Sequence, residues 1–245
     1  MRCFNNNFVH LTTRCPAYNN IRMDKKTQQI KNVCDFYVIT HNLKNSFRMG
    51  WKVWGIDAER FESVAEHVYG TQMLAFAINS EFELGLDLYK VIFMLAFHEL
   101  AEALTGDISF ISNDKDAPTR EEKGQMELEA IKKILAPMND SGTIHDIFVE
   151  FEENKTKEAK FARLVDKLDC DFQVKFYEEN GFNDIHKARE GIFEKLCSEG
   201  RAKGYKSLAK MWIEFDKAQF NYDEVFASIA DYIAENDIYK TGGNE

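Results

Sequence analysis

The chain has 245 residues, which suits one large domain or one domain with appendages. Hydrophobic residues make up 44% of the chain and aromatic residues 13%, so the composition excludes a disordered protein and supplies enough apolar surface for a sizeable core. A formal net charge of −10 gives no general attraction to a polyanion, which argues against duplex DNA and long RNA as partners, whereas a small phosphorylated ligand needs only one local cationic site or a metal.

The N-terminal stretch does not resemble a secretory signal, because no sustained apolar run follows Arg2. Arg2 and Arg14 precede the first acid, Asp24, which is weakly similar to an organelle-targeting segment, but a loose N-terminal extension over residues 1–26 is the simpler interpretation. No segment approaches the roughly 20 apolar residues that cross a bilayer. The five cysteines are scattered and form no C-x-x-C pair, which argues against a disulfide framework and a thiolate zinc site. We therefore expect a cytoplasmic protein with no membrane partner.

The first half of the chain predicts long helices. Residues 27–43 repeat apolar side chains at three- and four-residue steps, which indicates an amphipathic helix. The next segment, KNSFRMGWKVWGID, breaks this period and is expected to be a loop. Ser63 and Glu66 form a capping box that starts a helix running through Ile78. A very apolar helix is predicted over residues 88–104, and because it is apolar on nearly all sides we place it at the buried centre of a bundle.

The remaining elements are also helical. Residues 109–119 are expected to form a loop, and further helices are predicted over residues 120–135, 143–153, 156–180, 184–198, 205–220 and 223–235. Only three Pro and thirteen Gly interrupt the chain, and we find no convincing strand or repeat. The sequence therefore predicts an all-α, single-domain helical bundle. Its core is expected over residues 27–182, with a C-terminal helical extension over residues 183–245 packed on that core.

Ionisable residues interrupt the apolar helix over residues 88–104. Its sequence LAFHELAEAL contains His98, Glu99 and Glu102. A charged group in a dry core costs several kcal/mol unless it is paired, hydrogen-bonded or bound to a metal. His98 and Glu102 are four residues apart and share a helix face, with Glu99 adjacent to that face. The alternative is that both glutamates face solvent and that His98 is a structural core histidine.

Two further candidates lie on separate helices. His67 follows the capping box by one turn, and Asp166 lies between apolar positions of AKFARLVDKLDCDF, with Asp169 and Asp171 as rival carboxylates. The alternatives are a structural histidine and a solvated acidic face. Two imidazoles and two carboxylates suit one divalent ion such as manganese, cobalt, iron or zinc, rather than calcium. The predicted metal ligands are His67, His98, Glu99 and Asp166.

The order of several motifs resembles a known family. The segments are RMGW (48–51), ESVAEH (62–67), FHELAEALTGDIS (97–109), TREEK (119–123) and AKFARLVDKLD (159–169). Together they are similar to the HD-domain metal-dependent phosphohydrolases, and within them to the 5'-deoxynucleotidase-like branch. The resemblance implies an HD-domain type of fold and places the metal ligands on the four residues named above. One position departs from the family, because the doublet that is usually His-Asp is His98-Glu99 here.

The resemblance also implies roles for the neighbouring residues. Glu102 takes the position of the acid that works on the attacking water, and Asp107 that of the residue that contacts the sugar or assists the leaving group. Arg48 takes the position of the residue that grips the substrate phosphate, a task suited to a guanidinium group. Trp51 is a candidate to pack on the nucleotide, with core packing as the alternative. Glu102 and Asp107 are thus the predicted catalytic residues, and Arg48, Trp51 and Asp107 the predicted substrate-binding residues.

The implied activity is removal of phosphate from deoxynucleoside 5'-monophosphates, with a small-molecule nucleotide as partner and a homodimer as the assembly. One alternative is an HD phosphohydrolase that acts on a cyclic dinucleotide, an alarmone or a nucleoside triphosphate. Others are a non-catalytic helical module that senses a nucleotide, and a plain helical scaffold that binds no metal.

Overall fold

The computed structural model describes residues 24–108, 118–187 and 191–240. Within these ranges the regular elements are helices, and one isolated antiparallel β-bridge pairs Phe47 with Ser63. The predicted all-α class is therefore confirmed. Most of the expected loop over residues 109–119, and most of the expected N-terminal extension, lie outside the described residues.

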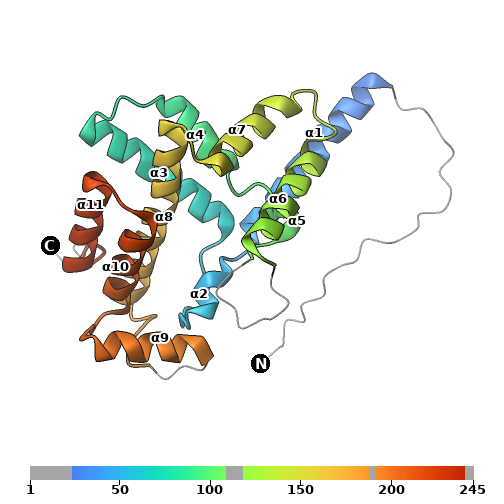
Figure 1. Ribbon diagram of the computed structural model, residues 1–245. Helices are drawn as coiled ribbons and strands as arrows, with labels where there is room; N and C mark the ends of the chain where they lie inside the picture. Colours follow the sequence, from blue (N-terminus) through green and yellow to red (C-terminus); the bar gives the residue numbers. More distant parts are fainter. Residues whose placement is uncertain (1–23, 109–117, 188–190, 241–245) are drawn as a thin grey trace.

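Figure 1 shows how the helices are arranged in space. In chain order they are α1 (Lys25–His41), the 3₁₀ turn η1 (Asn42–Lys44), α2 (Met49–Val53), α3 (Val64–Phe82), α4 (Leu88–Phe97), α5 (Glu102–Thr105), α6 (Arg120–Leu135), α7 (Ser141–Glu153), α8 (Lys157–Glu179), α9 (Gly191–Ala202), α10 (Leu208–Phe220) and α11 (Glu224–Glu235). The predicted capping box at Ser63 and Glu66 starts α3, and Thr119 and Glu122 form a second one at α6.

Helix α8 runs through the middle of the bundle (Figure 1). Helices α3, α4, α7, α10 and α11 all pack against it. Its side chains Val165 and Leu168 are fully buried in a cluster that also contains Leu95 of α4 and Ile213 of α10. Helices from both ends of the chain thus share one core, and residues after position 182 contribute to it.

The expectation that residues 88–104 form the buried centre is wrong. Val91 and Leu95 of α4 are 0% exposed, but Tyr89 is 91% exposed and Phe93 38% exposed. Helix α4 therefore buries one face and presents apolar side chains on the other. Apolar content alone could not distinguish a central helix from an edge helix, because the outer face of α4 is also apolar.

The helix expected over residues 88–104 is also divided in two. Helix α4 ends at Phe97, and the next turn uses tighter bonds, from the Leu100 N–H to the Phe97 carbonyl and from the Glu102 N–H to the Glu99 carbonyl. The His98 ring Nδ1 lies 2.7 Å from the Leu95 carbonyl oxygen, within the last turn of α4. This break separates His98 from Glu102, which a continuous helix would have placed on one face.

The segment expected to be a loop contains the short helix α2. Trp51 and Trp54 are 2% and 8% exposed, so burial of two indole rings holds a helix that local periodicity does not predict. Trp54 packs edge-on against Phe193 of α9, with ring centroids 5.1 Å apart. The contact joins the region near the predicted site to the C-terminal helices.

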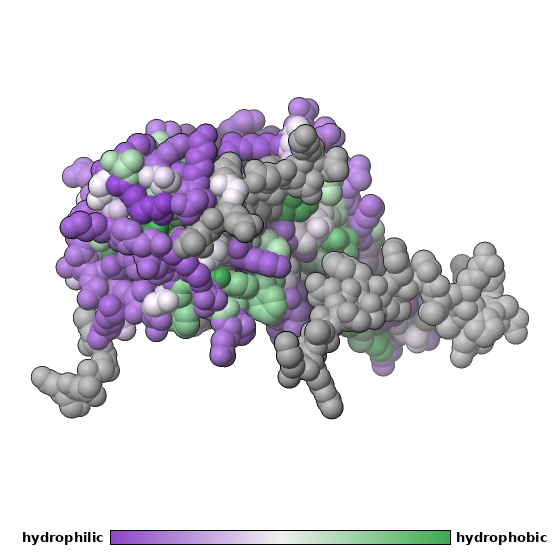
Figure 2. Space-filling model, turned by 90° about the horizontal axis from the view of Figure 1, so that it is seen from below, coloured by the Kyte–Doolittle hydropathy of each residue, from purple (hydrophilic) through white to green (hydrophobic). Residues whose placement is uncertain are grey.

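The surface is largely hydrophilic on the face drawn in Figure 2, with smaller hydrophobic patches between the polar side chains. Helix α1 extends beside α6 and has no fully buried side chain. Among the described helices, none combines the length and the apolar character that crossing a bilayer requires.

Candidate functional site

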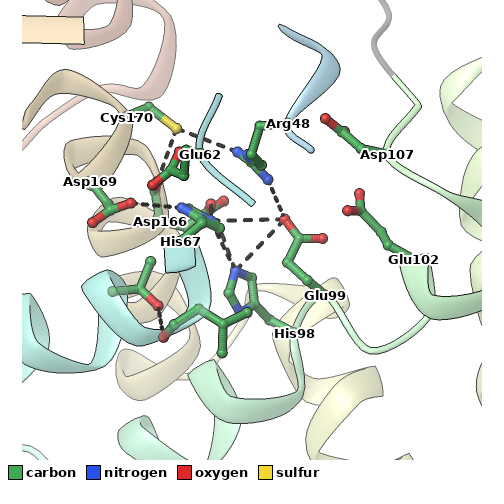
Figure 3. A network of polar contacts seen from close by, with 12 residues as sticks. Arg48, Glu62, His67, His98, Glu99, Glu102, Asp107, Asp166, Asp169 and Cys170 are labelled. Atoms are coloured by element: carbon green, nitrogen blue, oxygen red, sulfur yellow. Dashed lines mark hydrogen bonds and ion pairs between the residues drawn. The ribbon is translucent and has the colours of Figure 1, made fainter. Parts of the chain in front are cut away.

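The four predicted metal ligands come together from three parts of the fold. His67 is on α3, His98 and Glu99 are in the turn after α4, and Asp166 is on α8 (Figure 3). Each offers one ligand atom, and these atoms all lie within 4.8 Å of one another. His67 Nε2 is 3.0 Å from Asp166 Oδ1 and 3.4 Å from His98 Nε2, which is 3.8 Å from Glu99 Oε1. Two imidazole nitrogens and two carboxylate oxygens in this arrangement fit a divalent cation.

Hydrogen bonds on the far side of each ring orient the two histidines. The Leu95 carbonyl can only accept, so His98 must donate from Nδ1, which leaves Nε2 with a lone pair toward the cluster. His67 Nδ1 lies 2.7 Å from Asp169 Oδ2, so its Nε2 also faces inward. Asp169 was a rival for the ligand position in the sequence; in the structure it is the partner that positions His67.

Helix α3 makes room for Asp169 with a glycine. A Cβ atom at Gly70 would lie 2.4 Å from Asp169 Oδ1, which is too close for two non-bonded atoms. The lack of a side chain at Gly70 therefore allows the carboxylate of α8 to approach His67. Glu62, His67 and Asp169 form a second compact group of possible metal ligands. In this group Glu62 Oε2 already accepts a hydrogen bond from the Trp51 indole N–H at 3.0 Å.

Neighbouring charges and hydrogen bonds shift the pKa values of the residues in the cluster. Burial and Arg48 oppose protonation of His67, but hydrogen bonds to Asp166 and Asp169 raise its pKa to about 9. Burial raises the pKa of Glu99, yet His98 and Arg48 outweigh it and lower the value to about 2. Burial likewise opposes ionisation of Asp166, but Lys167 and His67 hold the pKa of that carboxyl well below its usual range. Both carboxylates are therefore ionised near neutral pH and available as ligands.

Arg48 reaches the cluster from the segment before α2. The bond from its backbone N–H to the Glu62 carbonyl, at 2.9 Å, fixes that segment beside the start of α3. Its guanidinium donates to Glu99 Oε1 at 2.8 Å and lies 3.5 Å from Cys170 Sγ. The residue predicted to grip phosphate thus contacts a predicted metal ligand.

The cluster opens into a cavity of about 970 Å³ whose lining includes His98, Glu99 and Asp166. Glu102 and Asp107 also line it. They lie on one side of the cluster and do not take part in the compact ligand group (Figure 3). The cavity is large enough for a nucleotide-sized ligand.

Glu102 is 3% exposed, and its Oε2 has no hydrogen-bond partner among the described residues. Burial raises its pKa well above the usual value, and the negative charges of Glu99 and Asp107 add to the shift. Arg48 and Lys123 oppose this shift, and the Nζ of Lys123 lies 3.8 Å from Glu102 Oε1. A buried carboxyl with one free oxygen at a cavity wall is suited to exchanging a proton with a bound molecule.

Asp107 and Trp51 lie beside the same cavity but differ in what they offer to a ligand. Asp107 Oδ2 accepts from the Met49 backbone N–H at 2.5 Å and is partly exposed. Trp51 is almost fully buried and packs against Tyr177 and Trp212, with ring centroids 5.4 and 5.3 Å away. Substrate contact by Trp51 therefore stays a prediction.

Sequence reasoning did not assign a role to two lysines and one cysteine around the cluster. Lys167 Nζ lies 2.9 Å from Asp166 Oδ2, and Lys123 and Cys170 line the cavity with it. Lys167 directly follows Asp166 in the sequence, but this adjacency does not say which way a flexible lysine turns. Cys170 lies one helical turn after Asp166, a spacing that could have indicated it.

Comparison with known proteins shows the family of the chain. A family model described as HD domain matches residues 40–209. The chain belongs to the HD domain family. The match spans all four clustered residues and extends through α9 to the start of α10.

Named members of the family are similar over most of this chain. It is 30% identical over 196 residues to "5'-deoxynucleotidase HDDC2" of Dictyostelium discoideum, which covers 77% of this chain and 100% of that protein. It is 32% identical over 162 residues to "5'-deoxynucleotidase hdd1" of Schizosaccharomyces pombe, with 63% and 77% covered. For "5'-deoxynucleotidase HDDC2" of Homo sapiens the identity is 28% over 191 residues, with 73% and 89% covered.

Solved structures share the HD domain fold. The structure titled "Predicted metal-dependent phosphohydrolase" from Magnetospirillum magnetotacticum aligns with a TM-score of 0.58 at 20% identity, covering 86% of this chain and 94% of that one. A protein from Pyrococcus horikoshii aligns with a TM-score of 0.54 at 21% identity, covering 84% and 98%. At these identities the likeness concerns the fold.

Proposed function

We propose that this HD domain protein is a metal-dependent phosphohydrolase that releases phosphate from deoxynucleoside 5'-monophosphates. The observation that carries the proposal is the group of two imidazoles and two carboxylates within 4.8 Å, at the wall of a cavity that Glu102 and Asp107 also line. Its similarity over most of the chain to proteins named 5'-deoxynucleotidase supports the choice of substrate.

We assign His67, His98, Glu99 and Asp166 as ligands of one divalent ion, which we propose to be manganese, cobalt, iron or zinc. The donor set of nitrogen and carboxylate oxygen favours these ions over calcium. Such an ion lowers the pKa of a coordinated water and offsets negative charge on the phosphoryl oxygens. Glu99 stands where the family usually has Asp, and its longer side chain still brings Oε1 within 3.9 Å of both imidazoles.

The neighbouring side chains supply the remaining chemistry. Burial raises the pKa of Glu102, which makes its carboxylate a stronger base, and a divalent ion bound beside it would favour the ionised form. That carboxylate accepts the proton of the attacking water on its unpartnered Oε2. Arg48 has guanidinium N–H groups beyond the one on Glu99, and these neutralise charge on the substrate phosphate. Asp107 contacts the sugar or assists the leaving oxygen from the same cavity. The products are a deoxynucleoside and inorganic phosphate.

We further propose that the chain forms a homodimer in the cytoplasm. Helix α3 exposes Tyr69, Met73 and Phe76 at helical spacing, with 66%, 47% and 58% of their surfaces accessible, and this apolar face supports self-association. Among the described residues, Cys34, Cys170 and Cys197 form no disulfide, as is usual in a reducing compartment. Light scattering on the purified protein measures the assembly.

Phosphate release tests the proposed function. The manganese- or cobalt-loaded protein should release phosphate from deoxynucleoside 5'-monophosphates faster than from a cyclic dinucleotide, an alarmone or a nucleoside triphosphate. His98→Ala should reduce both bound metal and turnover to background. His145→Ala removes an exposed imidazole from α7 and is the matched control, with metal and turnover unchanged. Wild-type turnover in His98→Ala would contradict the site, and nucleotide binding without turnover in the wild type would identify a sensor.

A further inference from the structure

Two cations contact the carboxylates of the metal cluster. The Arg48 guanidinium donates to Glu99 Oε1 at 2.8 Å, and the Lys167 ammonium lies 2.9 Å from Asp166 Oδ2. Asp166 uses its other oxygen, Oδ1, toward His67. Both cations line the cavity, as do Glu99 and Asp166, so each lies beside a predicted ligand at the wall of the space that a substrate would fill.

The lysine is held at the cavity wall from two sides. Its ammonium lies over the Phe220 ring of α10, 5.3 Å from the centroid, and Phe220 also lines the cavity. The Lys167 side chain is 29% exposed, whereas that of Asp166 is only 5% exposed. Phe220 and Asp166 together direct the ammonium along the edge of the cluster and leave part of it accessible from the cavity.

Two other cations of the cavity, Lys123 and Arg163, have partners outside the ligand group. Lys123 Nζ is 3.1 Å from Glu127, and the Arg163 guanidinium is 2.9 Å from Glu152 and packs on an aromatic ring. Neither of these glutamates belongs to the ligand group. Arg48 and Lys167, in contrast, contact the ligand carboxylates directly.

We propose that Lys167 is a second phosphate-binding residue, which shares the substrate phosphate with Arg48. This inference rests on the proposed function. A divalent ion and its two carboxylate ligands, Glu99 and Asp166, carry no net charge together, so the dianion of a phosphate monoester is balanced by the two cations. An ammonium group has three N–H donors, and one on Asp166 leaves two that can bind phosphate oxygens.

The geometry gives the C-terminal helices a part in substrate binding. Phe220 is at the end of α10, and its ring supports the lysine through a cation–π contact. Replacing that ring by leucine keeps an apolar neighbour but removes the attraction to the ammonium. We expect Phe220→Leu to weaken phosphate binding less than loss of the lysine itself.

Calorimetric titration of inorganic phosphate into the manganese-loaded protein tests the proposal without turnover. Lys167→Met should weaken phosphate binding roughly 10- to 100-fold, the range for loss of a charge-assisted hydrogen bond, and Lys167→Arg should restore most of it. Bound manganese and the affinity for a deoxynucleoside, which lacks the phosphate, should stay at the wild-type values. Lys160→Met removes an exposed lysine from the same helix and should change none of these.

Wild-type phosphate affinity in Lys167→Met would overturn the proposal, and so would absence of phosphate binding in the wild type. Equal weakening of phosphate and deoxynucleoside binding would also overturn it, because it would indicate a structural role. If Lys167→Met does not fold, Lys167→Gln and Phe220→Leu provide the same comparison. A wild-type protein that binds phosphate through Lys167 but hydrolyses no nucleotide would contradict the proposed function and leave this inference standing.

Discussion

Helix α8 carries buried carboxyl groups in two different electrostatic states. Asp166 lies in the cluster with His67 and His98, and Lys167 and His67 hold its pKa well below the usual range despite burial. Asp171 lies further along the same helix and is 0% exposed. Burial, followed by the charge of Asp216 on α10, raises the pKa of Asp171 well above its usual value.

The difference comes from the partners. Asp171 accepts from the Tyr222 hydroxyl at 2.9 Å, and its Oδ1 has no hydrogen-bond partner among the described residues. Burial likewise raises the pKa of Asp216 to about 7, although Lys167 opposes the shift. A buried carboxyl stays ionised where the imidazoles and cations around it outweigh the effect of burial, as at Asp166, and its pKa rises where they do not, as at Asp171 and Asp216. A ligand site is therefore marked by the neighbours of a carboxylate rather than by its burial.

The largest expected effect separates the two carboxyl groups directly. Asp166→Asn should reduce bound manganese and phosphate release to background, because it removes a charged ligand from the cluster. Asp171→Asn should keep full metal content, because Asp171 lies outside the ligand group and burial already raises the pKa of its carboxyl well above the usual value. Elemental analysis of the purified variants measures the metal. A folded Asp171→Asn protein that has lost its metal would contradict the difference in role between Asp166 and Asp171.

Glu102 sharpens the comparison, because it shares the raised pKa of Asp171 but faces the cavity. Glu102→Gln should lower kcat roughly 10²- to 10⁴-fold, the usual contribution of a positioned acid or base. Bound metal should be unchanged, since Glu102 is outside the ligand group. Steady-state kinetics with metal analysis gives both quantities, and an unchanged kcat would remove Glu102 from the mechanism.

The smallest effect concerns stability. Burial gives Asp216 a pKa of about 7 in the folded protein, above the ordinary value of 3.8, so the folded protein holds a proton that the unfolded chain releases between these values. Its contribution to stability is therefore lost as the pH rises through this window. Asp216→Asn stays neutral and should gain about 2 to 3 kcal/mol relative to the wild type between pH 5 and pH 8. Urea unfolding at both pH values measures the difference in the free energy of unfolding. The same change with pH in the wild type and in Asp216→Asn would contradict the raised pKa of Asp216.

Much of the secondary structure follows from local pattern. Apolar periodicity and capping residues predict α3, α6 and α8 closely, because these signals act within a few turns of chain. The pattern misses α2, whose tryptophans are buried by distant residues, and the break at His98. It also places α4 at the centre of the bundle, although Tyr89 faces outward. These features depend on which helices meet.

The sequence by itself determined the helical class and the set of candidate ligands, because periodicity, caps and ionisable residues within apolar runs are local properties. Only the tertiary structure showed how the surroundings of Asp166, Asp169 and Asp171 differ, because the three lie on one helix and differ in what packs against them. It made Asp169 a partner of His67 and paired Asp171 with Tyr222. The physical reason is that the charge and role of a buried carboxyl depend on groups a few ångströms away, and most of those groups come from remote parts of the chain.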